Sequence, residues 1–187
     1  MSIIHTVSED EATGDIAAIY QSEREHYGYV PAHTPTMAMN PAALHGFEAI
    51  TGSLAERLGV RTYRLVTLAA AGALRSQSCL LAHGNMARKI MDDDQIIAVA
   101  HDYHEAGLTD AEVAMMDFAV KVCGDSASMT DADALVLRDH GFTDEQIVDI
   151  ALAAAVRNYY SRALHALGVE VDVPPALPEP VREALLA

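Results

Sequence analysis

A cysteine and a histidine one helical turn apart are the best candidates for chemistry in this 187-residue chain. Cys79 and His83 have i, i+4 spacing, which places both side chains on one face of a helix. With Ser76 or Ser78 as N-cap, Cys79 falls in the first turn, where the helix dipole favours a reactive thiolate. His83 would share a proton with the sulfur or relay one to a substrate. The alternative is that Cys79 is a small buried apolar side chain, the usual role of a free cysteine.

The segments that position this pair are predicted to be helices, because apolar residues recur at helical spacing and no segment alternates like a strand. Residues 61–75 are apolar nearly all round, which is typical of a buried helix. We expect one all-α domain over 1–187, with an N-terminal helix and crossing segment (1–40), a core (41–170) and a Pro-rich tail (171–187). The predicted helices span 9–27, 41–58, 61–75, 76–91, 93–104, 109–122, 130–139 and 144–167 (one long helix or a bent pair), and 29–41 is predicted to be extended.

An internal repeat indicates two related helical units. A shift of 82 residues superimposes 59–84 on 141–166. Ser161 then takes the place of Cys79, so only the first unit carries a thiol. The coincident pairs are Gly59 and Gly141, Val66 and Val148, Arg75 and Arg157, and His83 and His165, together with three alanines.

Charge and hydrophobicity exclude several classes of partner. The chain has 27 acidic and 12 basic residues, a formal charge of −15, and no basic stripe, so we expect neither nucleic acid nor an anionic membrane as partner. No apolar run approaches the roughly 20 residues of a membrane span. The N-terminus lacks the basic and apolar regions of a secretory signal, so we expect a cytoplasmic protein. Its two cysteines, Cys79 and Cys123, are predicted to be free thiols there, and the sequence leaves open whether they meet in space.

Metal binding is not expected, although the chain has nine histidines. His101 and His104 have i, i+3 spacing, but no group has the paired spacing of a structural zinc site or an H-E-x-x-H motif. We therefore predict solvated histidines, with no metal and no cofactor.

Several polar residues in apolar stretches are predicted to be structural. Arg75, Arg157 and Arg162 are expected to be buried and paired with carboxylates. Tyr159 and Tyr160 are expected to pack in the same interior.

Residues 59–87, and more loosely 29–170, resemble the alkylhydroperoxidase D / carboxymuconolactone decarboxylase superfamily, in particular its peroxidase-related branch. The family motif is Glu, eleven residues, then Cys-x-x-Cys-x-x-x-His. Cys79 matches the second cysteine and His83 the histidine. The segment NYYSRALHALGVEVD also resembles the N-x-x-x-R-x-x-x-x-LG ending of that branch, with Asn158 and Arg162 at the Asn and Arg positions.

Three positions depart from this pattern. Ser76 stands where the family has its first cysteine, Arg64 where it has the glutamate, and Ser78 where well-known peroxidase members have a histidine. The disulfide of the family therefore cannot form within the motif. Three routes remain: Cys79 works alone and is resolved by an external thiol, Cys123 resolves it, or the pocket serves another purpose.

The resemblance implies an all-α, alkylhydroperoxidase D-like bundle that assembles as a homo-oligomer (dimer, trimer or hexamer). It also implies a peroxidase-related oxidoreductase in which Cys79 attacks a hydroperoxide and His83 is its proton partner. Ser76 would donate a hydrogen bond in place of the resolving thiol. Arg64 would stabilise negative charge, unless it forms an ordinary surface salt bridge.

Two alternatives remain open. One is a decarboxylase or lactone-processing enzyme that uses His83 and Arg64 on a carboxylate substrate, with Cys79 as pocket lining. The other is a non-catalytic binding or scaffold protein on the same fold, which the loss of the glutamate and the first cysteine favours.

Overall fold

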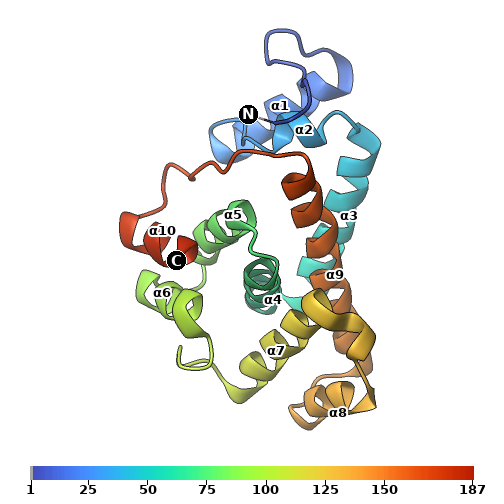
Figure 1. The fold of residues 1–187 in the computed structure, drawn as a ribbon, viewed down its shortest axis with the longest axis vertical. Helices are drawn as coiled ribbons and strands as arrows, with labels where there is room; N and C mark the ends of the chain where they lie inside the picture. The colour runs from blue at the N-terminus through green and yellow to red at the C-terminus, as the bar shows by residue number, and fades with distance from the viewer. Residues whose placement is uncertain (1) are drawn as a thin grey trace.

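The computed structural model describes residues 2–187, and these fold into α-helices without a strand (Figure 1). None of these helices is both long and apolar enough to cross a membrane. The elements are α1 (Gly14–Tyr27), α2 (Thr34–Met37), α3 (Pro41–Leu58), α4 (Val60–Ala73), α5 (Gln77–Ala87), α6 (Asp93–Asp102), α7 (Asp110–Asp125), the 3-10 turn η1 (Ser126–Ser128), α8 (Asp131–Asp139), α9 (Asp144–Ala166) and α10 (Glu179–Leu186).

Helix α4 lies at the centre, as its apolar sequence predicts. Leu65, Val66 and Ala70 are fully buried, and α4 packs against α3, α5, α7 and α9. Figure 1 shows α4 with these helices around it. Burial on all sides of its middle turns removes most of its apolar surface from water, so α4 is the element on which the others assemble.

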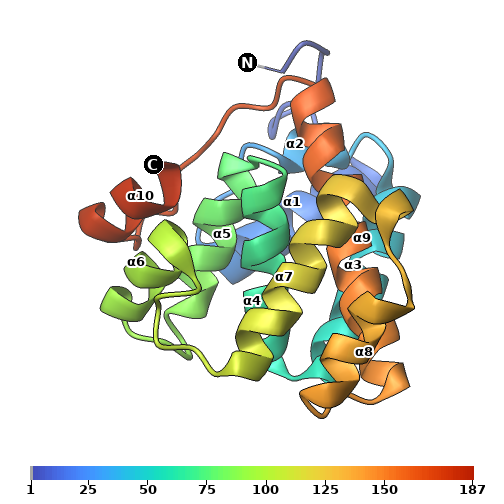
Figure 2. The same cartoon turned by 60° about the horizontal axis from the view of Figure 1, so that its bottom comes forward.

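Helix α9 is a single long helix rather than a bent pair. It begins with a capping box between Thr143 and Gln146, which satisfies free N–H groups of its first turn. It packs against α3, α4 and α7 over its length (Figure 2). Two polar residues that it carries, Arg157 and Ser161, are buried.

The N-terminal segment differs from the prediction in two places. The first helix begins at Gly14 and not at residue 9, and a short helix, α2, interrupts the crossing predicted to be extended over 29–41. The side chains of Ile19, Tyr20 and Met37 form a second apolar cluster, and Cys79 belongs to it. Helices α1 and α2 therefore cover the thiol.

The C-terminal segment, predicted only as a Pro-rich tail over 171–187, ends in a helix that the sequence analysis did not predict. Residues 172–176 are irregular, but α10 follows them and packs against α5 and α6. Val181, Ala184 and Leu185 recur at helical spacing and are buried. The prolines before α10 obscured this short amphipathic pattern, and Figure 1 shows the tail crossing to α10 beside α5 and α6.

The internal repeat has a counterpart in the backbone. Gly59 lies between α3 and α4 with φ 78°, and Gly141 lies between α8 and α9 with φ 90°. Only glycine adopts this conformation without a steric penalty. The copies differ at Arg75, where φ is 52° and the first unit breaks into α4 and α5, whereas α9 continues through the equivalent position.

The contact between α5 and α10 generates a stability prediction. A Cβ built on Gly84 would lie 2.3 Å from Leu185 Cδ1, so Gly84→Ala forces the buried leucine to move. We expect Gly84→Ala to destabilise the wild-type protein by about 1 kcal/mol or more through overpacking. In a Leu185→Ala background, Gly84→Ala should stabilise the protein by roughly 0.5–1 kcal/mol, because alanine is more favourable than glycine in a helix interior. Urea unfolding of the four proteins measures this coupling, and equal effects in both backgrounds would contradict the packing described here.

Candidate functional site

Cys79 lies in the first turn of α5, where the sequence places it. After α4 ends, the left-handed Arg75 reverses the chain, and Ser76 N–H donates to the carbonyl of Ala71 over 2.9 Å. Ser76 is the N-cap of α5. The thiol is therefore close to the positive end of the helix dipole, and only 4% of the residue is exposed.

The sulfur of Cys79 contacts two polar groups of α9. Ser161 Oγ lies 3.3 Å from Sγ, and Arg157 Nη1 donates to Sγ over 3.6 Å. Arg157 and Ser161 have i, i+4 spacing and share one face of α9. Cys79 and Ser161 are the two positions that the internal repeat superimposes, and they face each other in the core.

Arg157 has no carboxylate partner among residues 2–187, so the prediction that it is carboxylate-paired is wrong. Only 4% of the residue is exposed, and its Nε has no hydrogen-bond partner. Its guanidinium carbon lies 5.2 Å from the ring centroid of Phe47 and 5.6 Å from that of Tyr160. These rings compensate part of the charge, and the sulfur of Cys79 is its hydrogen-bond acceptor.

His83 lies one turn after Cys79 but does not hydrogen-bond to it in the described chain. Its Nδ1 is 2.8 Å from Arg64 Nη1. A guanidinium is only a donor, so Nδ1 accepts and the ring proton is on Nε2. Burial, together with the charges of Arg157 and Arg64 and the nearby His33, lowers the pKa of His83 well below 6.5. His83 is therefore a neutral imidazole at physiological pH.

Arg64 and Ser76, two of the three departures from the family pattern, both face this interior. Arg64 forms no ion pair among residues 2–187, so the surface salt-bridge interpretation is wrong. Its Nε is buried without a partner, and burial lowers the pKa of its guanidinium. Ser76 is fully buried, and its Oγ neither caps α5 nor bonds elsewhere.

Cys123 lies in the other apolar cluster, among residues of α4, α7 and α9. It is a free thiol that donates to the carbonyl of Ala154 over 3.6 Å. Burial raises its pKa to about 11. A thiol with so high a pKa is almost wholly protonated at neutral pH, which makes it a poor resolving nucleophile.

A small cavity of about 140 Å³ adjoins the thiol helix. Its lining includes Ser78 and Ala82 of α5, His33 of the N-terminal segment, and Asp172 and Pro174 of the tail. Tyr27 also lines it, but neither Cys79 nor His83 does. The His33 ring also contacts Tyr160, with centroids 5.7 Å apart. Burial and the charge of Arg157 lower the pKa of His33 to about 4, and Asp172 opposes them. This cavity is thus coupled electrostatically to the Cys79 site.

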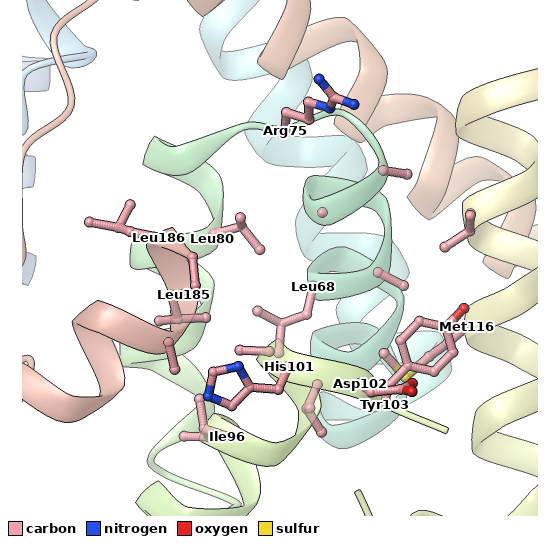
Figure 3. A pocket seen from close by; sticks show the side chains of 18 of the residues that line it. Leu68, Arg75, Leu80, Ile96, His101, Asp102, Tyr103, Met116, Leu185 and Leu186 are labelled. Carbon is pink, nitrogen blue, oxygen red and sulfur yellow. The ribbon is translucent and has the colours of Figure 1, made fainter. Parts of the chain in front are cut away.

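The larger cavity, of about 770 Å³, is elsewhere. It lies between α4, α6, α7 and α10, and Figure 3 shows Leu68, Ile96 and Leu185 around it, with His101 pointing inward. Helix α5 contributes Gln77 and Leu80 to its lining but neither Cys79 nor His83. The candidate site and this larger cavity are therefore on different sides of α5.

The remaining predicted residues have structural contacts. Arg162 Nε donates to Asn158 Oδ1 over 3.0 Å. His104 bonds Asp102 and Asp117 on the surface. Tyr160 is buried at the site, whereas Tyr159 is half exposed.

Sequence reasoning missed three contributors to the site. Arg157 was identified only as a buried residue, although its repeat mate Arg75 stands one turn before Cys79, just as Arg157 stands one turn before Ser161. That spacing was the available signal. His33 and Phe47 carry no such signal, because only the packing of distant segments places them here.

Comparisons with solved structures agree with this fold. An uncharacterized peroxidase-related protein with an alkylhydroperoxidase AhpD core, from Ralstonia eutropha JMP134, has 28% identity and a TM-score of 0.81 over 91% of this chain and 92% of that one. An uncharacterized peroxidase-related protein from Silicibacter sp. TM1040 has 27% identity and a TM-score of 0.78, over 89% and 92%. The debrominase Bmp8, solved as a cysteine-to-alanine variant with 2,3,4-tribromopyrrole, shares the fold at 15% identity and a TM-score of 0.76, over 99% and 98%. No protein-family model and no curated protein matches the sequence.

The fold and the buried thiol on its central helix pair define an all-α protein of the AhpD type. The chain belongs to the alkylhydroperoxidase D-like superfamily, as its motif resemblance predicts. Its particular form of the site has Ser76 and Arg64 in place of the first cysteine and the glutamate.

Stability should depend on pH through the buried imidazoles. An unfolded histidine binds a proton below about pH 6.5, whereas folded His33 stays neutral down to about pH 4. Because the unfolded state binds more protons in this window, His33 lowers stability as the pH falls from 6.5 to 4. Glu23 acts in the opposite sense, since burial raises its pKa from 4.5 to about 7.

The test therefore compares a variant with the wild type. Between pH 6 and 5, His33→Gln should gain stability relative to wild type by up to about 1.4 kcal/mol per pH unit. Urea unfolding at several pH values measures the difference. A difference that is constant with pH would show that His33 titrates normally in the folded protein.

Proposed function

We propose that this protein is a single-thiol hydroperoxide reductase, in which Cys79 reduces the peroxide and an external thiol regenerates it. The observation that carries the proposal is the buried Arg157 guanidinium, which has the Cys79 sulfur as its acceptor and no carboxylate partner in the described chain. A cation in this position favours the thiolate, which is the nucleophilic form of cysteine. The first-turn position of Cys79 acts in the same direction.

The reaction has two stages. The thiolate attacks the terminal peroxide oxygen, an S–O bond forms, the O–O bond breaks, and the departing alkoxide takes a proton from water to give the alcohol. Cys79 is then a sulfenic acid. One external thiol attacks its sulfur and releases water, and a second thiol breaks the mixed disulfide, which restores Cys79 and yields an external disulfide.

The neighbours of Cys79 fit this reaction. Ser161 Oγ, 3.3 Å from the sulfur, would donate to the thiolate. Neutral His83, with its proton on Nε2, would donate a hydrogen bond to the peroxide rather than remove a proton. Ser76, fully buried with a free hydroxyl, would be a second donor. The cavity of about 140 Å³ lies on the same helix but is not lined by Cys79 itself, and its size favours a small hydroperoxide.

An external reductant is favoured over Cys123. Ser76 replaces the local resolving thiol, and the raised pKa of Cys123 leaves it protonated. The two solved proteins at 27–28% identity are named peroxidase-related, which supports the reaction class.

A second candidate function is a carboxylate-processing enzyme that works through His83 and Arg64, with Cys79 only lining the pocket. The 2.8 Å contact between Arg64 and His83 favours it. It predicts that alkylation of Cys79 leaves activity intact, whereas the peroxidase proposal predicts complete loss. A non-catalytic binding role predicts that Cys79 reacts slowly with iodoacetamide and turns over no peroxide.

The first test is Cys79→Ser. We expect turnover of tert-butyl hydroperoxide with dithiothreitol to fall by at least about 100-fold, because a serine hydroxyl is not ionised at neutral pH. Cys123→Ala is the matched control and should keep wild-type turnover. Dimedone labelling and mass spectrometry should find the sulfenic acid on Cys79 after peroxide treatment. Unchanged turnover in Cys79→Ser would refute the proposal.

The second test addresses Arg157. In a Cys123→Ala background, iodoacetamide should alkylate Cys79 at pH 7 about tenfold more slowly in Arg157→Gln, because the thiolate loses its cation. Arg162→Gln removes an exposed positive charge from the same helix and should leave the rate unchanged. Thermal melting checks that both variants fold. A Cys79 that never reacts in the native protein, or equal rates in all three proteins, would mean that Arg157 does not activate the thiol.

A further inference from the structure

The interior around Cys79 is positively charged, although the chain as a whole carries −15. Arg64 and Arg157 both act electrostatically on His83, and Arg157 lowers the pKa of Arg64. The two histidines nearby, His33 and His83, are neutral because burial lowers their pKa values. The site thus concentrates cationic groups in a protein whose surface repels anions.

Neither guanidinium is neutralised by an ion pair within the described residues. Arg64 and Arg157 each have a buried Nε without a hydrogen-bond partner. Removing a charged group from water without an opposite charge costs several kcal/mol per ion, by order of magnitude. Arg157 has the Cys79 sulfur as its acceptor and the Phe47 and Tyr160 rings beside its guanidinium. The guanidinium carbon of Arg64 lies 5.5 Å from the ring centroid of Tyr63. Its one polar acceptor is the neutral ring of His83, so no opposite charge is paired with it in the described chain.

We infer that the substrate of the Cys79 site carries a carboxylate and that Arg64 binds it. This inference rests on the proposed hydroperoxide reductase function and names its substrate class: a small hydroperoxide with an acidic group.

Arg64 is better suited to this role than Arg157. A guanidinium has five N–H donors and can bind a carboxylate through two parallel hydrogen bonds. Arg64 donates to His83 through Nη1, and its other N–H groups are available to a substrate. Arg64 is also only partly buried, whereas the Phe47 and Tyr160 rings lie against the guanidinium of Arg157. The substrate carboxylate would therefore bind one turn along α5 from the sulfur, at the level of His83.

The small cavity lies beside this site, although Arg64 is not among the residues that line it. Tyr27 lines the cavity and lies near Arg64. Burial raises the pKa of Tyr27, and the charge of Arg64 partly offsets that rise. Two carboxyl groups face this region. Asp172 at the wall accepts the N–H of Ala32 over 3.0 Å, and Glu23 has a pKa raised to about 7, so much of it is protonated at neutral pH.

The experiment compares 4-hydroperoxy-4-methylpentanoate with its methyl ester, which differ in one negative charge. We expect wild-type kcat/KM to favour the acid by about tenfold or more, the size of one charge-assisted hydrogen-bond pair. Arg64→Gln should reduce the ratio to near one, and Arg64→Lys should restore part of it. Because the ratio is taken within each protein, any common effect of the substitution on Cys79 cancels. Arg75→Gln, which removes an exposed arginine outside the site, should keep the wild-type ratio.

A second readout does not need turnover. The unreactive acid 4-methylpentanoate should raise the melting temperature of Cys79→Ala, and this shift should be lost when Arg64→Gln is added. Equal kcat/KM for acid and ester in the wild type, or a preference that survives Arg64→Gln, would overturn the inference while leaving the peroxidase proposal standing. If no hydroperoxide is reduced but the Arg64-dependent thermal shift appears, the peroxidase proposal fails and the carboxylate site stands.

Discussion

The buried contact between the Arg157 guanidinium and the Cys79 sulfur is the constraint on which this site depends. A guanidinium in an apolar interior needs an opposite charge or strong acceptors. Here the described chain provides two aromatic faces and one sulfur. The burial of Arg157 beside this sulfur is therefore the feature from which the proposed role of Cys79 follows.

The helices packed around this contact shield it from solvent. Helix α4 anchors both α5, which carries Cys79, and α9, which carries Arg157. The N-terminal helices close the remaining side through a separate apolar cluster. Because α5 is braced on its outer side by α10, the helix with the thiol has a partner on each flank. A rigid, water-poor setting strengthens each electrostatic contact in the site.

The two substitutions in the family motif change the electrostatics together. In place of a glutamate, Arg64 brings a cation to His83 and holds its proton on Nε2, so the imidazole serves as a donor and not as a base. In place of a thiol, Ser76 leaves a free hydroxyl in the interior. An acidic proton relay with a local disulfide thus becomes a cationic pocket with a single thiol. This form of the site suits an external reductant and an anionic substrate.

The sequence by itself determined most of the helices, the first-turn position of Cys79 and the class of fold, because apolar spacing, capping residues and a local motif act over a few residues. It also indicated, through the 82-residue repeat, that Cys79 and Ser161 are equivalent. Only the tertiary structure decided which groups meet. In the folded protein His83 contacts Arg64, and the sulfur of Cys79 contacts Arg157 and Ser161. His33 reaches the same region from a segment distant in the sequence. The tertiary structure also revealed α10, the helix that follows the Pro-rich segment. These contacts join residues far apart in the chain, and no local pattern specifies the packing that brings them together.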